Sequence, residues 1–161
     1  MANPNSEVLY GTLADDTILA AQGNDTISAG AGADIVYGNQ GSDVLYLGDG
    51  DDVGYGGQAK DTLLGGAGDD LIYGNNGVDV LSGGLGNDTL FGGNGTDTLS
   101  GGDDRLAGNN GPNVYVFDSD DGNDTISGFQ VGNGYLRFGD AMTVILNADV
   151  DGTALVTYGT T

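Results

Sequence analysis

An aspartate recurs at every ninth position over more than half of the chain. When the sequence is divided into nine-residue units from Gly11, ten complete units follow one another, and place six of each unit is an aspartate. These residues are Asp16, Asp25, Asp34, Asp43, Asp52, Asp61, Asp70, Asp79, Asp88 and Asp97. Carboxylates that lie a few ångströms apart repel each other unless a cation sits between them. The recurrence therefore favours repeated binding of a hard cation by oxygen ligands.

The turns that carry these aspartates are rich in glycine. The unit that begins at Gly65, for example, has the sequence GGAGDDLIY. Glycine readily adopts the positive φ angles that tight turns require, and it lets several backbone carbonyl oxygens face one gap. Calcium accepts about six to eight oxygen ligands in irregular geometry, whereas magnesium requires a near-ideal octahedron and keeps much of its water. Aspartates combined with carbonyls thus favour calcium.

The composition excludes several other classes of function. The chain has 161 residues, enough for one domain, and carries 24 acidic residues, three basic residues and a net charge of −21. This charge disfavours nucleic acids and anionic membrane surfaces as partners. Cysteine and histidine do not occur, which excludes disulfides, zinc–thiolate sites and a histidine general base. No unique acid–base pair stands outside the repeat, so we do not expect an enzyme.

The sequence also bears on membranes and export. No apolar run approaches the roughly 20 residues of a membrane-spanning helix, so we expect no membrane insertion. The N-terminal sequence MANPNSEVLY lacks the basic and apolar regions of a cleavable secretion signal. We therefore expect that, if the protein is exported, it leaves the cell by a route that needs no such signal.

The repeat predicts short strands joined by tight turns. Place eight is apolar in nine of the ten units, with Gly54 as the exception. A period of nine residues is too short for a helical hairpin and is typical of a β-solenoid. Because side chains alternate along a strand, we expect place eight to face the interior and places seven and nine to face outward.

The nine-residue register is interrupted beyond residue 100. Residues 101–107 form a unit that is two residues short, and the next unit has Asn113 at the aspartate place. Phe117 and Asp118 then form an insertion, after which the unit at 119–127 restores the original register. We therefore expect the solenoid to continue to about residue 127.

Three segments follow from this pattern. We expect an N-terminal lead-in at 1–10 and a solenoid at 11–127 whose register is broken at 101–118. A C-terminal β capping segment is expected at 128–161, where the alternation over 135–159 predicts antiparallel strands. Such a cap covers the open strand edges at the end of a solenoid.

The consensus Gly-Gly-x-Gly-x-Asp-x-apolar-x resembles the nonapeptide of the RTX, or haemolysin-type calcium-binding, repeat family. This resemblance runs from Gly11 to Ser100 without a gap. It implies an all-β fold, a right-handed parallel β-roll in which two units form one coil of eighteen residues with three-residue strands. It also implies a non-catalytic protein that binds calcium ions between successive coils.

The resemblance implies a specific set of ligands. Carbonyls of places two and four and the aspartate of one turn combine with carbonyls of places one and three and the aspartate of the turn eighteen residues later. The best-formed site is then made by Gly66, Gly68 and Asp70 with Gly83, Leu85 and Asp88. Applied along the chain, the rule gives about eight sites. Its further backbone ligands are Gly23, Gly30, Gly32, Gly38, Gln40, Gly41, Leu47, Gly48, Asp49, Gly50, Gly56, Gly57, Gln58, Gly65, Ala67, Gly74, Asn75, Asn76, Gly77, Gly92 and Asn94, with the carboxylates of Asp104 and Asp124 beyond the tenth unit.

Two turns depart from the pattern. In one, Ala59 replaces the usual glycine and Lys60 places a cation beside Asp61; in the other, the first turn GTLADD lacks its second and third glycines. We expect weaker calcium sites there. Aspartate side chains at variable places are expected to be solvated charges, namely those of Asp15, Asp49, Asp51 and Asp69.

The two outer faces of the expected roll differ. Place nine on the sheet of the odd-numbered units is occupied by Leu19, Tyr37, Tyr55, Tyr73 and Phe91, whereas the other sheet is rich in hydroxyl side chains. An apolar column on so charged a protein favours an interface through Tyr37, Tyr55, Tyr73 and Phe91, with a second copy of the chain or with part of a parent protein. Strand propensity alone is the alternative explanation.

Two functions are consistent with these features. The resemblance implies a calcium-binding module that folds on binding calcium in the extracellular medium and serves secretion, folding or cell-surface structure. Proteins of this family commonly leave Gram-negative cells unfolded through a one-step, type I exporter. The alternative is a C-terminal or accessory module of a larger secreted enzyme, toxin or adhesin, for example a polysaccharide-modifying protein.

Overall fold

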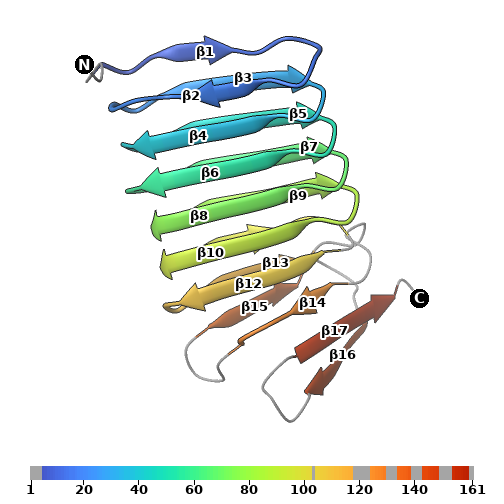
Figure 1. The fold of residues 1–161 in the computed structure, drawn as a ribbon. Coiled ribbons are helices and arrows are strands. Elements are labelled where there is room, and N and C mark those ends of the chain that lie inside the picture. The colour runs from blue at the N-terminus through green and yellow to red at the C-terminus, as the bar shows by residue number, and fades with distance from the viewer. Residues whose placement is uncertain are drawn as a thin grey trace.

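The chain folds into a solenoid of two stacked β-sheets (Figure 1). The computed structural model describes residues 5–102, 104–117, 124–129, 134–138, 143–148 and 154–159. Over these residues the chain forms strands and no helix, so no membrane-spanning helix is found among them. The prediction of an all-β, parallel solenoid is confirmed.

The strands alternate between an eight-stranded sheet, called sheet A, and a nine-stranded sheet, called sheet B. Sheet A contains, in spatial order, β1 (Val8–Tyr10), β3 (Thr26–Ala31), β5 (Val44–Asp49), β7 (Thr62–Ala67), β9 (Val80–Leu85), β11 (Thr98–Ser100), β13 (Val114–Phe117) and β15 (Tyr135–Phe138). Sheet B contains β2 (Thr17–Leu19), β4 (Ile35–Gln40), β6 (Val53–Gln58), β8 (Leu71–Gly77), β10 (Thr89–Gly95), β12 (Arg105–Asn110), β14 (Thr125–Ile126), β17 (Ala154–Gly159) and β16 (Thr143–Ala148).

Each repeat strand pairs in parallel with the strand one coil away. In sheet A Leu45 lies opposite Leu63, eighteen residues along the chain. Strands β3 to β10 have six or seven residues rather than the expected three. They are longer because the ladder of backbone hydrogen bonds continues into the first places of the next unit, where Gly48 pairs with Gly66.

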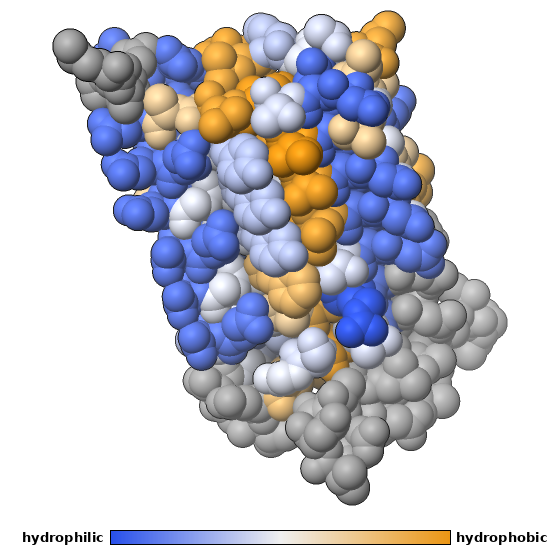
Figure 2. All heavy atoms as spheres, viewed as in Figure 1, coloured by the Kyte–Doolittle hydropathy of each residue, from blue (hydrophilic) through white to orange (hydrophobic). Residues whose placement is uncertain are grey.

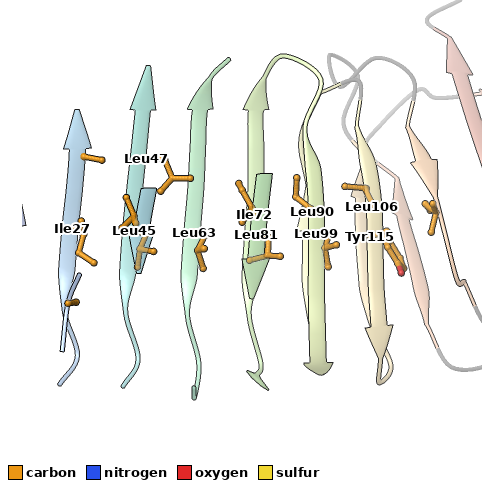
Figure 3. Close-up of a cluster of buried hydrophobic side chains, with 14 of the residues drawn as sticks. Ile27, Leu45, Leu47, Leu63, Ile72, Leu81, Leu90, Leu99, Leu106 and Tyr115 are labelled. Atoms are coloured by element: carbon orange, nitrogen blue, oxygen red, sulfur yellow. The ribbon is translucent and has the colours of Figure 1, made fainter. Parts of the chain in front are cut away.

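The place-eight side chains form a continuous core between the two sheets (Figure 3). The fully buried members are Ile27, Val36, Leu45, Leu63, Ile72, Leu81, Leu90 and Leu99. Leu47, from place one of the same unit, points into the core and fills the space beside Gly54. A Cβ atom added at Gly54 would lie 3.0 Å from Leu47 Cδ1 and 3.3 Å from Leu63 Cδ2.

The solenoid begins before Gly11. Strand β1, in the segment expected to be a lead-in, pairs in parallel with β3 in the eighteen-residue register. Leu9 packs against the core, and the Glu7 N–H donates to Asp25 Oδ1 at 2.7 Å. Glu7 thus occupies the aspartate place of an additional unit. This unit was not predicted because its acidic residue is a glutamate.

The far end of the solenoid differs in part from expectation. The register shortens by two residues where Thr89 pairs with Arg105, and lengthens by two where Arg105 pairs with Thr125. Phe117, expected in an insertion, is a buried residue of β13 and stacks on Phe138 with ring centroids 5.3 Å apart. Strand β15 pairs in parallel with β13 and so extends the solenoid beyond residue 127, contrary to the antiparallel expectation. Strands β16 and β17 do pair antiparallel, and β17 lies antiparallel to β14.

Candidate metal centre

The repeated aspartates form two rows of buried carboxylates along the edges of the solenoid. Nine of them, from Asp25 to Asp97, expose 2% of their surface or less. One oxygen of each carboxylate joins two coils: the Asp52 N–H donates to Asp70 Oδ1 at 2.9 Å, and the Asp70 N–H donates to Asp88 Oδ1 at 2.8 Å. The same bond links Asp16 to Asp34, Asp25 to Asp43, Asp34 to Asp52, Asp43 to Asp61, Asp61 to Asp79 and Asp79 to Asp97.

The second oxygen of these carboxylates is buried and has no hydrogen-bond partner. This holds for Oδ2 of Asp25, Asp34, Asp43, Asp52, Asp61, Asp70, Asp79, Asp88 and Asp97. An unpaired buried carboxylate oxygen is strongly unfavourable, because it has lost its water and gained no donor. A bound cation is the partner that such an oxygen requires.

In four turns a backbone oxygen of the next coil lies near the unpaired carboxylate oxygen, namely that of Asp43, Asp61, Asp70 and Asp79. A Cβ atom added at Gly38 would lie 2.6 Å from Asp43 Oδ2 and 2.6 Å from the Gly56 carbonyl oxygen. The same two distances recur at Gly74, with Asp79 Oδ2 and the Gly92 carbonyl oxygen. The glycine at place one therefore leaves room for two oxygens that converge from successive coils.

In the predicted site at Gly65, other backbone carbonyls lie between the same two coils. In the turn at Gly65, the carbonyls of Gly66 and Gly68 point forward to Gly84 and Gly86 of the next coil. From that next coil, the Leu85 carbonyl points back and accepts the Gly68 N–H at 2.8 Å. Of the carbonyls that the resemblance implied for this site, those of Gly66 and Gly68 are thus directed at the next coil, and that of Leu85 is directed back and already accepts a hydrogen bond.

The gap between Asp16 and Asp34 differs from the others. Asp16 Oδ2 already accepts the Thr12 N–H at 2.6 Å and the Thr12 hydroxyl at 2.8 Å. Thr12 occupies the place of the missing second glycine. A cation at this site would have to displace both donors, in keeping with the weaker site expected there.

The turn at Ala59-Lys60 keeps the backbone geometry of the glycine turns. Ala59 has a φ angle of 80°, in the left-handed region that non-glycine residues rarely adopt. Its carbonyl oxygen lies against Gly77 of the next coil, as the glycine carbonyls do elsewhere. The alanine therefore preserves the direction of the carbonyl at a cost in backbone strain.

The two rows end differently. One row continues through Asp104 and Asp124: the Asp88 N–H donates to Asp104 Oδ1 at 3.1 Å, and the Asp104 N–H donates to Asp124 Oδ1 at 2.9 Å. In the other row the Asp97 N–H donates to Asn113 Oδ1 at 2.8 Å. The Asn113 Nδ2 atom lies against Gly108, where the other turns place a carboxylate oxygen. A nitrogen donor cannot ligate calcium, so this gap lacks the second carboxylate.

The aspartates at place five were missed as structural residues. Asp51 Oδ1 accepts the Asp69 N–H at 2.9 Å, Asp69 Oδ1 accepts the Asn87 N–H at 2.8 Å, and Asp15 Oδ1 accepts the Ala33 N–H at 2.9 Å. These exposed side chains link coils in the direction opposite to the buried row. The Asn87 N–H lowers the pKa of Asp69. These side chains are exposed, as expected, and the expectation missed only their hydrogen bonds between coils.

The electrostatics of the buried rows disfavour charge unless a cation is bound. Burial raises the pKa of Asp61 and Asp70 to about 7, and that of Asp52 and Asp79 to about 6. The accepted N–H bonds lower these pKa values in part, while neighbouring aspartates raise them again. Calcium would remove both penalties, because it replaces lost solvation and separates like charges.

The predicted aromatic column is present on the outer face of sheet B. Tyr37, Tyr55, Tyr73 and Phe91 stack with ring centroids 4.9, 5.0 and 5.0 Å apart and planes within 11° of parallel. All four rings are half-buried, because each covers the faces of its neighbours.

The comparison with known families agrees with this geometry. A family model described as RTX calcium-binding nonapeptide repeat (4 copies) matches the chain at residues 2–36, 10–45, 20–54, 29–63, 46–81, 55–90 and 73–105. No curated protein matches the chain at a significant level. No group of three or more acidic side chains clusters as a metal site within the described ranges, in keeping with gaps that combine two carboxylates with carbonyls.

Proposed function

Because the chain belongs to the RTX calcium-binding nonapeptide repeat family, we propose that it is a non-catalytic module that folds on binding several calcium ions. The observation that carries this proposal is the row of buried, unpaired Oδ2 atoms, four of which lie near a carbonyl oxygen of the next coil. Nine nearly inaccessible carboxylates lie between successive coils. Without a cation, those carboxylates oppose the fold that buries them.

The ligands of one site are drawn from two turns. Between the turns at Gly65 and Gly83 they are the carbonyls of Gly66, Gly68, Gly83 and Leu85 and the carboxylates of Asp70 and Asp88. Bound calcium would neutralise both carboxylates and join the two coils. Applied to all turns with a pair of place-six aspartates, this arrangement supports about eight ions, with the Asp16 site the weakest.

The small core explains why folding would depend on metal. Each eighteen-residue coil buries little more than two aliphatic side chains, for example Leu63 and Ile72. That is little apolar surface for so many ordered residues, many of them glycines with high conformational entropy. Metal-binding free energy supplies stability that the core does not.

The calcium concentration that the sites need indicates where the protein acts. RTX repeats of this kind bind calcium weakly enough to load where calcium is abundant, which is the extracellular medium. We therefore place the protein outside the cell or at its surface, after export in an unfolded state by a type I route. Folding would then begin only on the calcium-rich side.

A second candidate function is supported by the aromatic column on sheet B. In this alternative the roll is a module of a larger secreted enzyme, toxin or adhesin, and the face with Tyr37, Tyr55, Tyr73 and Phe91 contacts a parent segment or a second copy. Both candidates share the calcium-dependent fold and differ only in what covers this face.

The proposed function is tested by titrating the calcium-free chain with calcium. Far-UV circular dichroism should change from a disordered to a β-rich spectrum, and calorimetry should give several ions per chain with cooperative uptake. Magnesium at the same concentration is the control and should not induce the β spectrum. A spectrum that is the same in chelator and in millimolar calcium would overturn the proposal.

A further inference from the structure

The outer face of sheet B carries more than the aromatic column. Strands β4, β6, β8 and β10 of this sheet each present an aliphatic or threonine side chain, then an aromatic ring, then an asparagine or glycine; on β4 these are Ile35, Tyr37 and Asn39. Figure 2 shows this face, with a hydrophobic column, a paler column beside it and hydrophilic residues along both flanks. The face is therefore amphipathic across its width and regular along its length.

A row of amide side chains borders this face at the turn edge. At place three of successive turns it consists of Gln22, Gln40, Gln58, Asn76, Asn94 and Asn110. Neighbouring amides bond to each other: Gln22 Nε2 donates to Gln40 Oε1 at 3.1 Å, and Asn94 Nδ2 donates to Asn76 Oδ1 at 2.8 Å. A primary amide has two N–H donors and two acceptor sites. One bond to each neighbour leaves it further capacity to bind a ligand.

Between the amide row and the rings, asparagine and glycine alternate from strand to strand. Asn39, Gly57, Asn75, Gly93 and Asn109 occupy this column. The asparagines have φ angles of 75°, 76° and 60°, in the left-handed region that asparagine tolerates best after glycine. Each glycine leaves a shallow hollow flanked by asparagines, of about 340 Å³ at Gly57 and about 570 Å³ at Gly93.

The two edges of this face differ in charge. Between residues 11 and 100, the aspartates outside the buried rows are Asp15, Asp49, Asp51 and Asp69. All four belong to odd-numbered units, whose turns lie on the edge opposite the amide row. The turns that carry the amide row have Asn24, Ser42, Lys60, Val78 and Thr96 at place five. The amide edge of this face thus carries no exposed aspartate between residues 11 and 100, whereas Asp51 and Asp69 lie just before strands β6 and β8 and border the face on its opposite edge.

We propose that this face, here called the amide groove, binds an uncharged, extended polysaccharide that lies along the solenoid axis. The groove offers amides and tyrosine hydroxyls for sugar hydroxyls, and apolar ring edges for sugar C–H groups, and its amide edge carries no exposed aspartate between residues 11 and 100. One sugar in an extended chain is about as long as the spacing between strands, roughly 5 Å. In a β-1,4-linked chain successive sugars turn over, so its two-residue period matches an asparagine on every second strand.

The same observations make a second copy of the chain the weaker occupant. Stable self-association needs a large apolar core, and here the rings are half-buried against each other while amides and hollows fill half of the face. The proposal rests on the proposed function only in that the groove exists when the roll is folded. Folding and ligand binding are therefore measured separately.

The experiment uses the calcium-loaded chain, with its β-rich spectrum verified first. Isothermal titration is performed with hexamers of β-1,4-linked glucose, mannose and N-acetylglucosamine, with the corresponding dimers, and with polygalacturonate as an anionic probe. We expect at least one neutral hexamer to bind about tenfold or more tightly than its dimer, because it spans several hollows. Polygalacturonate should not bind.

Two variants locate the groove without removing the fold. The triple variant Asn39→Gly, Asn75→Gly, Asn109→Gly places in these turns the residue found naturally at Gly57 and Gly93, and should lose binding by about tenfold or more. Tyr37→Phe with Tyr55→Phe removes hydroxyls from a column that already contains Phe91, and should weaken binding. Tyr46→Phe on sheet A is the matched control and should bind as wild type.

Three results would overturn the proposal. The first is a folded, calcium-loaded chain that binds none of the neutral hexamers. The second is unchanged binding by the triple asparagine variant. The third is a dimer in sedimentation that the triple variant dissociates, which would assign the face to a second copy. Failure of the chain to fold with calcium would instead contradict the proposed function.

Discussion

At the scale of single residues, the two carboxylate oxygens of Asp70 have different roles. Oδ1 accepts the Asp52 N–H and joins two coils, whereas Oδ2 is buried beside the Gly83 carbonyl without a donor. The first role requires only an acceptor; the second requires a negative charge that a cation can neutralise. An isosteric amide can therefore separate them.

We predict that Asp70→Asn keeps the inter-coil hydrogen bond and loses calcium. Because Asp70 borders two gaps, one with Asp52 and one with Asp88, calorimetry should show about two fewer ions per chain. The matched control is Asp69→Asn, which retains the acceptor for the Asn87 N–H on the exposed place-five row and should bind the wild-type number. Equal stoichiometry for the two variants would contradict the assignment of Asp70 as a ligand.

Ala59 offers a test of backbone strain in the same turns. Its φ angle of 80° is unfavourable for alanine, and glycine occupies the corresponding place in most turns. Ala59→Gly should stabilise the calcium-loaded roll by about 1 kcal/mol, the lower end of the cost of such a conformation. The measurement is urea unfolding in saturating calcium. Gly68→Ala, at a φ angle of 131°, introduces the opposite change and should destabilise; stabilisation by both would refute this account.

At the scale of strands and coils, the core shows how one irregular unit is accommodated. The unit from Leu47 to Tyr55 places glycine where other units place an aliphatic residue, and compensates with a leucine at place one. The neighbouring coils have Ala29 and Gly65 at that position. Leu47 and Gly54 thus form a coupled pair.

We predict strong coupling between these two positions. Leu47→Ala alone should cost about 2–5 kcal/mol, because it opens a cavity beside Gly54. Gly54→Val alone should cost about 1–3 kcal/mol, because its side chain meets Leu47. The double variant restores an aliphatic residue at place eight and should recover about 1–3 kcal/mol relative to the sum of the single changes. Additive losses in calcium-saturated urea unfolding would contradict the pairing.

Much of this scale could be predicted from sequence, because one period specifies strand, turn and core together. The buried place-eight residues and the inward aspartates followed from the nine-residue spacing. Leu47 could not be predicted, since place one is glycine or alanine in the other units and only packing decides that a larger side chain there fills the space beside Gly54. The additional unit with Glu7 and strand β1 was not predicted, because the repeat was identified by its aspartates and this unit has a glutamate instead. The amide row escaped because its members stand out only when the turns are sorted by edge.

At the scale of the whole molecule, the buried rows link folding to protons as well as to calcium. Burial raises the pKa of Asp61 and Asp70 to about 7 and of Asp52 and Asp79 to about 6, from 3.8. A carboxyl whose pKa is raised on folding binds its proton more tightly in the folded chain than in the unfolded chain. It therefore contributes stability to the calcium-free roll below about pH 4, and this contribution is lost as the pH rises through 6 and 7.

We predict that acid and calcium are alternative routes to the same fold. In calcium-free solution, β-rich circular dichroism should increase as the pH falls from 8 towards 4, since protonation also relieves repulsion in a chain of net charge −21. With calcium present, the midpoint of the calcium titration should move to higher concentration as the pH falls from 8 to 6, because each ion must displace protons from its carboxylates.

Asp70→Asn, which needs no proton to be neutral, should show a smaller pH dependence of the calcium-free spectrum, whereas Asp69→Asn should behave as wild type. Two results would contradict this prediction: a calcium-free chain that loses β structure on acidification, or a calcium midpoint that does not depend on pH. Either would show that folding does not raise the pKa values of the buried carboxylates.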